Sequence, residues 1–461
     1  MKLLEKDLRQ MRERLGLSQA KLAELSQVPQ HLLSAFELGK AGLTPKMLEA
    51  VEWALSNKQK VKEVASRRKR YQEHRYEQVE RLDERVARAA KSRGNAEYVD
   101  VLEQFARQHE STRKRELRAI SLFSGCGGFS LGFSSAGFDV IGFLELEKGL
   151  RDVYRSNFPR SMELGSDITQ VAQSALESHA TELGSVDVII GGPPCQGFSL
   201  SGKRRIDDPR NSLFRHYMRF VDAFQPKVAV LENVRLLTSM KSPSGAFVKD
   251  EISEEFKQHG YLIRYFEINA KDFGVPQHRE RVIFVAVRED LGVAPSLPDE
   301  THGTDTDLFT TLQPYRTFAD ACSDLAYLES GEELDDPYHA AVKHPAHVIK
   351  WLWDVKEGCS AHDNSDASLR PPSGYNTTYK RQVWNEPAST VQTTFGMISG
   401  CRNVHPIATR SLTIREAARI QSFPDSFKFI GSLGTIRTGI GNAVPPLLSN
   451  AIAKHLRHWL L

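Results

Sequence analysis

The sequence predicts a doubly wound α/β fold with a smaller second domain, preceded by a short all-α segment and a long helical linker. Near residue 119 the composition changes from charged, helical sequence to apolar, β-branched runs. These runs recur along the chain and end in Gly, Pro or acidic residues, as buried parallel strands followed by functional turns do. A glycine turn and a helix separate the first two runs, which is the pattern of a βαβ unit.

Composition and charge limit the classes of protein. The chain has 461 residues, 40% of them hydrophobic and 26% charged, which is enough for two or three domains. Residues 1–118 carry 26 Lys and Arg against 18 Asp and Glu, a net of +8, whereas the remainder nets −5. The asymmetry favours a polyanionic partner for the N-terminal quarter, although a solvated charged helix gives the same count.

The expected compartment is the bacterial cytoplasm. No apolar stretch has the length of a membrane span, and the first residues lack the apolar core of a signal peptide. The five cysteines are widely spread without framework spacing, so we expect free thiols in a reducing environment.

Residues 1–56 are predicted to form a helix-turn-helix domain. Apolar residues recur at helical spacing, Ser18 suits an N-cap, and Pro29 suits the first turn of the following helix. Residues 17–24 and 36–40 resemble the helix-turn-helix of phage repressors. That resemblance implies DNA contacts from Gln30, His31, Ser34 and Lys40. The alternative is a helical module used only for dimerisation.

Residues 57–117 are predicted to form a charged helical linker. The stretch is dense in Arg, Lys, Glu and Gln, which is typical of a long solvated helix. Two short apolar seams interrupt it: Val79, Leu82, Val86 and Ala89, then Tyr98, Leu102 and Phe105. Because a coiled coil needs several sustained heptads, dimerisation through these seams stays an open hypothesis.

A cofactor pocket is expected near the start of the next domain. The strand at 119–123 leads into a glycine turn and a helix, and the strand at 140–144 ends at Glu145. An acidic side chain about twenty positions after the glycines can accept hydrogen bonds from ribose hydroxyls. The turn lacks the dinucleotide spacing, which favours another adenosine cofactor over NAD. Asp167 follows the next segment and is placed to reach an adenine amino group.

Cys195 is the candidate nucleophile. The apolar strand at 186–190 stops at two glycines and two prolines, which display the thiol on a rigid turn at a strand end. A buried structural thiol is the alternative. A further strand ends in Glu232, and Arg279 and Arg281 share one face at a strand start, suited to orienting an anion or a carbonyl.

In this order the motifs resemble those of the DNA (cytosine-5-)methyltransferases, which use S-adenosyl-L-methionine. The resemblance covers residues 119–461 and includes the segments at 123–128, 193–196, 232–234, 277–281, 415–424 and 441–446. It implies a methyltransferase fold with a catalytic domain at 118–295, to which 436–461 return. It also implies a smaller target-recognition domain at 296–435, whose mixed aromatic, polar and basic residues suit base-edge readout.

The resemblance also implies a role for each candidate residue. Cys195 adds to carbon 6 of cytosine, Glu232 acts as the acid at N3, and Arg281 holds O2 with Arg279 beside it. The implied cofactor-binding residues are Phe123, Gly125, Gly127, Gly128, Glu145, Asp167, Ile168, Pro193 and Asn442. The implied DNA-binding loop carries Ser201, Lys203 and Arg204.

The predicted activity is methyl transfer to carbon 5 of a flipped cytosine in a specific duplex DNA sequence. Such an enzyme protects DNA from a cognate restriction endonuclease acting on the same site, with no stable complex implied. A tRNA cytosine-5 methyltransferase and a DNA-binding regulator are the alternatives. The histidines and cysteines between 296 and 410 match no zinc spacing, so no metal is expected.

Overall fold

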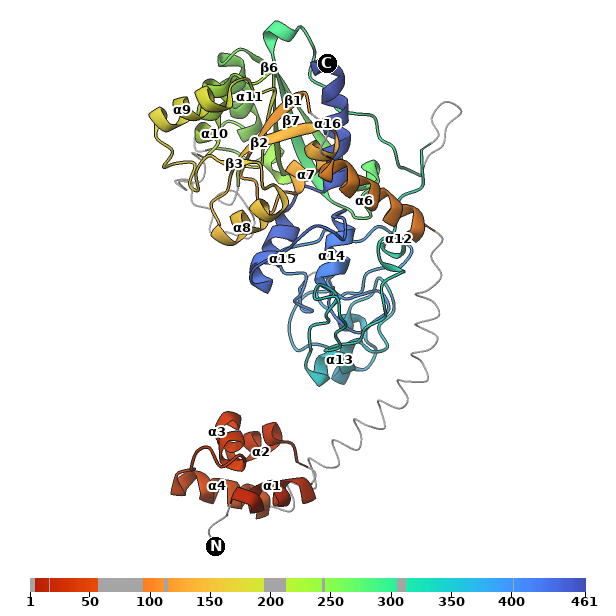
Figure 1. Cartoon of the computed structure of the whole chain (residues 1–461). Helices are drawn as coiled ribbons and strands as arrows, with labels where there is room; N and C mark the ends of the chain where they lie inside the picture. The colour runs from red at the N-terminus through yellow and green to blue at the C-terminus, as the bar shows by residue number, and fades with distance from the viewer. Residues whose placement is uncertain are drawn as a thin grey trace. The chain divides into compact units, whose positions relative to one another are not determined.

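The computed structural model describes residues 5–15, 17–56, 94–111, 115–194, 213–242, 245–304, 312–400 and 402–461. The chain divides into two compact units, Met1–Ala87 and Arg88–Leu461 (Figure 1).

The N-terminal unit is a small helical domain. Its helices are α1 (Glu5–Arg14), α2 (Gln19–Ser26), α3 (Gln30–Glu37) and α4 (Pro45–Ser56). The Ser18 hydroxyl accepts the Lys21 N–H and caps α2, as its sequence position predicts. Leu8, Leu22, Leu33 and Val51 are fully buried in the core. The predicted helical domain is confirmed.

The second unit is built on a seven-stranded sheet of order β3-β2-β1-β4-β5-β7-β6. The strands are β1 (Leu117–Leu122), β2 (Phe138–Leu144), β3 (Met162–Glu163), β4 (Val188–Gly191), β5 (Val228–Val234), β6 (Tyr261–Asn269) and β7 (Glu280–Arg288). Neighbouring strands are parallel except at β7, which runs antiparallel to both β5 and β6. The strand order reverses between β1 and β4, so a crevice opens there at the carboxyl ends of the strands.

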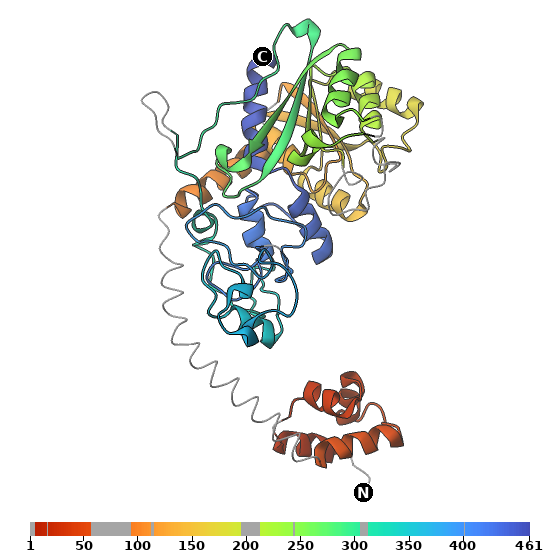
Figure 2. The same ribbon diagram turned by 180° about the vertical axis from the view of Figure 1, so that it is seen from behind.

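Helices cover both faces of the sheet (Figures 1 and 2). One face carries α9 (Gln173–Leu183), α10 (Leu213–Phe224) and α11 (Val248–Gln258), and the other carries α7 (Gly128–Ser135) and α16 (Pro446–Leu460). Consecutive side chains of β1 enter opposite clusters, because side chains alternate along a strand. The sheet is therefore buried on both sides, which explains its unbroken apolar runs and confirms the predicted α/β fold.

Close packing attaches the C-terminal helix α16 to α7. A Cβ on Gly132 would lie 2.3 Å from the Ser449 side chain, so this contact requires glycine. The Ser449 hydroxyl donates to the Phe129 carbonyl at 2.6 Å. The last helix thus packs beside the first helix of the sheet region.

Residues 312–432 form a second lobe with little regular structure. Its helices are α12 (Phe318–Cys322), α13 (Ala346–Leu352) and α14 (Ile414–Ile420); α8 (Lys148–Asn157) and α15 (Leu433–Asn442) lie near its boundary with the sheet. The buried Arg381 guanidinium donates to the carbonyls of Leu352, His405, Ile407 and Ala408. In the described part of the chain, these buried carbonyls have no hydrogen-bond partner in a neighbouring strand, so the Arg381 guanidinium supplies the donors that they need.

The last part of the expected linker, 57–117, differs from the prediction. Residues 95–110 form α6 (Asn95–Glu110), and its Tyr98, Leu102 and Phe105 are buried in the core of the second unit. The seam that we considered for dimerisation packs within the same chain, because the 3.6-residue period does not specify its partner. The other seam, at 79–89, lies outside the described residues.

Among the described residues, no helix combines the length and the apolar character that a membrane crossing requires.

Candidate active site

A cavity of about 480 Å³ lies at the carboxyl edge of the sheet, within the usual size range of small-molecule sites. It brings together most of the predicted site residues: Phe123, Gly125, Gly128, Glu145, Asp167, Ile168, Pro193, Glu232, Arg279, Arg281 and Asn442. They come from β5, β7, α7, α15, the residue before β7 and the loops that follow β1, β2, β3 and β4. The doubly wound topology collects them, because all the parallel strands end at this edge.

Gly127 is the cofactor-pocket residue that does not line the cavity. Its φ is +103°, and a Cβ there would lie 2.6 Å from the Phe158 ring. The residue is needed for the left-handed turn that begins α7. Its structural role is therefore clear, and its predicted role as a binding residue is not supported by its position.

Phe123 has a positive φ of +52°, although it is not glycine. A bulky residue rarely adopts this conformation, and such strain is concentrated at functional sites. The residue lines the cavity directly before the glycine turn. The sequence does not reveal this strain.

Glu145 is held by the turn that it faces. Its Oε2 accepts the Gly125 N–H at 2.8 Å and its Oε1 accepts the Glu147 N–H at 2.9 Å. Burial raises the pKa of Glu145, and the backbone hydrogen bonds oppose this shift. Each oxygen keeps a further lone pair that can accept a ligand hydroxyl.

Asp167 is oriented in a similar way from another loop. Its Oδ1 accepts the Thr169 N–H at 2.9 Å and the Thr169 hydroxyl at 2.7 Å. The carboxylate is fixed on the wall of the same cavity as Glu145.

Glu232 and Arg281 form an ion pair on the cavity wall. Arg281 Nε lies 2.6 Å from Glu232 Oε1, and the two side chains are only 14% and 11% exposed. In the β5–β7 register Glu232 is opposite Ile283 and Val234 is opposite Arg281. The pair therefore occupies diagonal positions on one face, within reach of long side chains.

Arg279 differs from its neighbour in what it binds. Its guanidinium is completely buried and donates from both Nη atoms to the Gly441 carbonyl at 3.1 Å, and from Nη1 to Val391 O at 3.4 Å. Burial lowers its pKa well below the usual arginine value. Arg279 lines the cavity, but its hydrogen bonds tie β7 to the end of α15.

The turn that leads to the candidate nucleophile is anchored by Asn233. Its Nδ2 donates to the Pro193 carbonyl at 2.8 Å. Cys195, two positions later in the chain, lies outside the described residues, as do Ser201, Lys203 and Arg204. The sequence does not indicate this role of Asn233, although the residue directly follows Glu232.

Two buried amides join three of the sequence motifs. Gln277 Nε2 donates to Gln421 Oε1 at 2.6 Å, and Gln277 Oε1 accepts the Val391 N–H at 2.9 Å. Gln421 Nε2 donates to the Ile440 carbonyl at 2.6 Å and to the Ala443 carbonyl at 3.5 Å. Both glutamines lie in segments that carry the family resemblance, but nothing in the sequence indicates that they bond each other.

A family model for C-5 cytosine-specific DNA methylases matches residues 117–458. The chain belongs to this family. It is a DNA (cytosine-5-)methyltransferase, and the predicted family and activity are confirmed.

Curated relatives agree with the family match. The chain is 40% identical over 343 residues to the Type II methyltransferase M1.HphI of Haemophilus parahaemolyticus, covering 73% of this chain and 86% of the relative. It is 35% identical over 379 residues to the Type II methyltransferase M.DdeI of Desulfomicrobium norvegicum, covering 74% and 88%.

Solved structures show the same fold. A protein described as a DNA modification methyltransferase of an Escherichia coli prophage matches with a TM-score of 0.58 and 26% identity, over 75% of this chain and 99% of that one. Spodoptera frugiperda DNMT2 matches with a TM-score of 0.51 at 18% identity, over 75% and 100% of the two chains. The second likeness concerns the fold alone.

The N-terminal part of this methyltransferase matches a helix-turn-helix family model over residues 8–55. On its helix α3, Gln30 and His31 are exposed and Ser34 is half-buried, while Lys40 is exposed just after the helix. The predicted helix-turn-helix is confirmed; the DNA contacts of these four residues stay a prediction.

The described part of the methyltransferase holds no cluster of three or more His, Cys, Asp or Glu side chains arranged for a metal ion.

Proposed function

We propose that this methyltransferase acts through a covalent addition by Cys195 to a cytosine held against Glu232 and Arg281. The observation that carries the proposal is the position of the Glu232–Arg281 pair. It lines the same cavity as Pro193, two residues before Cys195, and as the carboxylates Glu145 and Asp167. A base-facing acid and a cofactor-facing carboxylate are thus found in the same crevice.

The cavity fits S-adenosyl-L-methionine, the usual methyl donor of methyltransferases. Glu145 and Asp167 offer carboxylate oxygens for ribose hydroxyls and an adenine amino group, and Phe123, Leu146 and Ile168 offer apolar surface. The N-terminus of α7 follows the glycine turn and favours a carboxylate. The bound cofactor would supply an electrophilic methyl group. We assign these residues, with Pro193 and Asn442, to its binding.

Thiolate addition solves a problem of reactivity. Carbon 5 of cytosine is a weak nucleophile until a thiolate adds at carbon 6 and makes the ring enamine-like. Glu232 takes up a proton from solvent, which releases Arg281, and donates that proton at N3, which draws electrons from carbon 6. Arg281 then donates to the base oxygen. After methylation, loss of the carbon 5 proton breaks the bond to sulfur and releases the thiolate.

We place the DNA at a second cavity beside this site. About 500 Å³ in volume, it is lined from the sheet side by Arg235, His278 and Arg281 and from the second lobe by Thr390, Gln392 and Arg402. Its lining also includes Glu280, which pairs with Arg235, while Arg281 and Arg402 suit phosphate contacts and Gln392 suits base-edge contacts. Because carbon 6 is inaccessible within a duplex, the cytosine must be flipped out of the stack. We assign Ser201, Lys203 and Arg204 to the loop that closes over it.

The test compares Cys195→Ala and Glu232→Gln with the unmodified chain. Methylation of duplex DNA is followed with labelled S-adenosyl-L-methionine, and bisulfite sequencing locates the modified cytosine. We expect no detectable product from Cys195→Ala and a kcat lowered by about 100-fold or more for Glu232→Gln. Robust methylation by Cys195→Ala would overturn the covalent mechanism. A parallel reaction on tRNA tests the alternative substrate, and faster turnover there contradicts the DNA assignment.

A restriction-modification role follows from the relatives. Both relatives described above are named Type II methyltransferases. We infer that methylation by this chain protects DNA from an endonuclease that cuts the same sequence. DNA from expressing cells should resist enzymes that cut at the methylated sequence, and cleavage as complete as in unmodified DNA contradicts the inference.

We also propose that the helix-turn-helix binds DNA independently of the catalytic site and regulates transcription, for example of its own gene. The exposed Gln30 and His31 on α3 support the idea, since the start of a recognition helix reads base edges. Gel shifts on promoter fragments that lack the methylation sequence should be lost in the Gln30→Ala/His31→Ala variant. Unchanged binding by that variant would show that Gln30 and His31 do not contact the DNA.

A further inference from the structure

Helix α6 lies outside the part of the chain that matches the methylase family, yet it completes the core of the catalytic unit. The match begins at residue 117, whereas α6 spans Asn95–Glu110. Tyr98, Leu102 and Phe105 are 1–3% exposed and belong to a cluster with side chains from both the sheet region and the second lobe. Figures 1 and 2 show α6 running from α7 to α12.

The first half of α6 is bonded to the second lobe. Asn95 Nδ2 donates to the Asp320 carbonyl at 3.0 Å and to Asp324 Oδ1 at 2.8 Å. The Tyr98 hydroxyl donates to the Arg419 carbonyl at 2.5 Å, in a completely buried position. These contacts fix the N-terminal end of the helix against α12 and α14.

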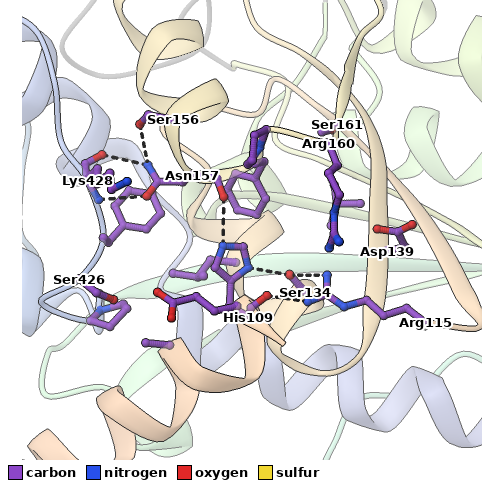
Figure 3. A pocket seen from close by; sticks show the side chains of 18 residues that line it. His109, Arg115, Ser134, Asp139, Ser156, Asn157, Arg160, Ser161, Ser426 and Lys428 are labelled. Atoms are coloured by element: carbon purple, nitrogen blue, oxygen red, sulfur yellow. Dashed lines mark hydrogen bonds between the residues drawn. The ribbon is translucent and has the colours of Figure 1, made fainter. Parts of the chain in front are cut away.

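The other end of α6 is bonded to the sheet region. The Phe105 carbonyl accepts the Ser135 hydroxyl at 3.0 Å. His109 Nδ1 lies 2.7 Å from the Ser134 hydroxyl and Nε2 lies 3.1 Å from the Asn157 carbonyl (Figure 3). Burial lowers the pKa of His109 to about 4, so the ring is neutral at pH 7 and can donate from one nitrogen and accept at the other.

Asn157 also connects this end of α6 to the second lobe. Its side-chain amide donates to the Lys428 carbonyl at 2.9 Å and accepts the Lys428 N–H at 3.0 Å (Figure 3). The guanidinium of Arg115 donates to the His109 carbonyl at 2.7 Å and satisfies the end of the helix. Both ends of α6 are therefore held near the boundary between the lobes.

Arg419, whose carbonyl accepts the Tyr98 hydrogen bond, is connected to the candidate active site by further hydrogen bonds. Arg419 is followed by Ile420 and Gln421, and Gln277 Nε2 donates to the Ile420 carbonyl at 3.2 Å and to Gln421 Oε1 at 2.6 Å. Gln277 lies four residues before Arg281, whose guanidinium pairs with Glu232 at 2.6 Å. Each step in this path is a hydrogen bond, an ion pair or a short length of backbone.

We propose that α6 is a strap that sets the position of the second lobe against the sheet, and that Tyr98 is a positioning residue for the Glu232–Arg281 pair. The proposal rests on the proposed roles of Glu232 and Arg281. Small displacements of reacting groups reduce rates strongly, so a strap of this kind affects turnover beyond its effect on stability. A helix that only adds buried area affects stability alone.

Tyr98→Phe in the full-length chain isolates the strap's hydrogen bond. The ring and its packing are kept, while one O–H is lost and the buried Arg419 carbonyl is left without it. Tyr261→Phe is a matched control. The buried Tyr261 hydroxyl also donates to a backbone carbonyl, that of Pro226 at 2.7 Å. That bond joins the start of β6 to the residues before β5, at the opposite end of the strands from the cavity.

The experiment measures thermal unfolding and steady-state methylation of duplex DNA for both variants and for Glu232→Gln. We expect similar decreases in Tm for the two tyrosine variants. Only Tyr98→Phe should lower kcat, by roughly fivefold to tenfold, with the KM for S-adenosyl-L-methionine unchanged. The split between kcat and KM, at equal stability, distinguishes positioning from a purely structural role.

Two results contradict the proposal in different ways. If Tyr98→Phe and Tyr261→Phe have the same kcat while Glu232→Gln is inactive, the strap idea is wrong and the proposed mechanism stands. If Glu232→Gln retains full activity, the proposed role of Glu232 is wrong, and the positioning role that depends on it falls with it.

Discussion

The ion pair between Arg12 and Glu37 is predicted to determine whether the N-terminal unit stays folded. Arg12 Nε and Nη2 donate to the two oxygens of Glu37 at 2.7 and 3.0 Å, and Gln19 Nε2 adds a third bond at 2.7 Å. The two charged side chains are 11% and 3% exposed. Glu37→Gln removes the charge and, among the described residues, leaves the buried guanidinium only Glu13 as a counter-ion, whose half-exposed carboxylate lies 3.6 Å from Arg12 Nη2.

The magnitude is large compared with the stability of a domain of this size. Removing one partner of a buried ion pair costs about 3–5 kcal/mol. A helical domain of about 56 residues has a free energy of unfolding of roughly 3–8 kcal/mol. At the lower cost of about 3 kcal/mol its Tm falls by roughly 12–24 °C. At the higher cost of about 5 kcal/mol the unit unfolds at room temperature if its free energy of unfolding lies in the lower part of that range.

Calorimetry on the full chain is the assay, because Met1–Ala87 is a separate compact unit. Glu37→Gln should abolish or strongly lower the transition of this unit and leave that of residues 88–461 unchanged. Glu13→Gln is the control: the same charge is removed from a side chain that is 53% exposed, pairs with Arg9 at 3.0 Å and approaches Arg12 only at 3.6 Å without a hydrogen bond. A Glu37→Gln transition within a few degrees of the Glu13→Gln transition would refute the reasoning.

The same pair gives a pH dependence of known sign. Burial opposes ionisation of Glu37, but the hydrogen bonds from Arg12 and Gln19 outweigh it and hold its pKa below the usual value. A carboxylate with a lowered folded pKa stabilises fully above its unfolded pKa of about 4.3. The stabilisation is lost as the pH falls through the lower folded value. Unfolding of this unit at pH 7 and pH 3 should therefore differ more in the unmodified chain than in Glu37→Gln.

Two further predictions concern the site. Gly441→Ala should lower both Tm and kcat, because a Cβ there lies 2.4 Å from the Thr393 nitrogen and displaces the carbonyl that Arg279 binds, at a cost of about 1–3 kcal/mol. The control is Gly434→Ala on the same helix, where an added Cβ meets nothing closer than 3.7 Å. Equal effects of the two substitutions contradict the packing argument. Asn233→Ala should lower kcat by about tenfold or more with little change in the KM for the cofactor, because the Pro193 carbonyl loses its hydrogen-bond donor and the turn before Cys195 is no longer anchored. A kcat equal to that of the unmodified chain shows that Asn233 does not position the nucleophile.

The fold and several polar residues of the cavity wall could be predicted because strand ends carry information in the sequence. Glu145 and Glu232 each stand directly after, or at the end of, an apolar run, and parallel strands bring such ends to one edge. Gly125 and Gly128 mark the turn that opens α7. The period of a strand and the position of the polar residue after it are local features of the sequence. They can therefore be read without knowing which distant segment packs against the strand.

Interactions between distant segments could not be predicted in this way. Gln277 forms hydrogen bonds with residues that are 143 and 144 positions away in the sequence, and Arg279 donates to a carbonyl 162 positions away. A charged or amide residue next to a strand, such as Gln277 or Arg279, is equally consistent with ligand binding and with a structural role. The structure distinguishes Arg281, which faces Glu232, from Arg279, whose Nη atoms donate to backbone carbonyls. The alternation that puts both arginines on one face says nothing about which partner each one meets.

Helix α6 illustrates the same limit at the level of a whole element. Its spacing of Tyr98, Leu102 and Phe105 predicts an apolar stripe and nothing about what the stripe covers. In the fold the stripe is satisfied within the chain, so it provides no surface for a dimer. A helix that is bonded to both lobes and precedes the methylase match by only a few residues extends the catalytic unit toward the N-terminus. Any truncation made at the boundary of the family match therefore removes part of the catalytic core, and a loss of activity in such a variant says nothing about the helix-turn-helix.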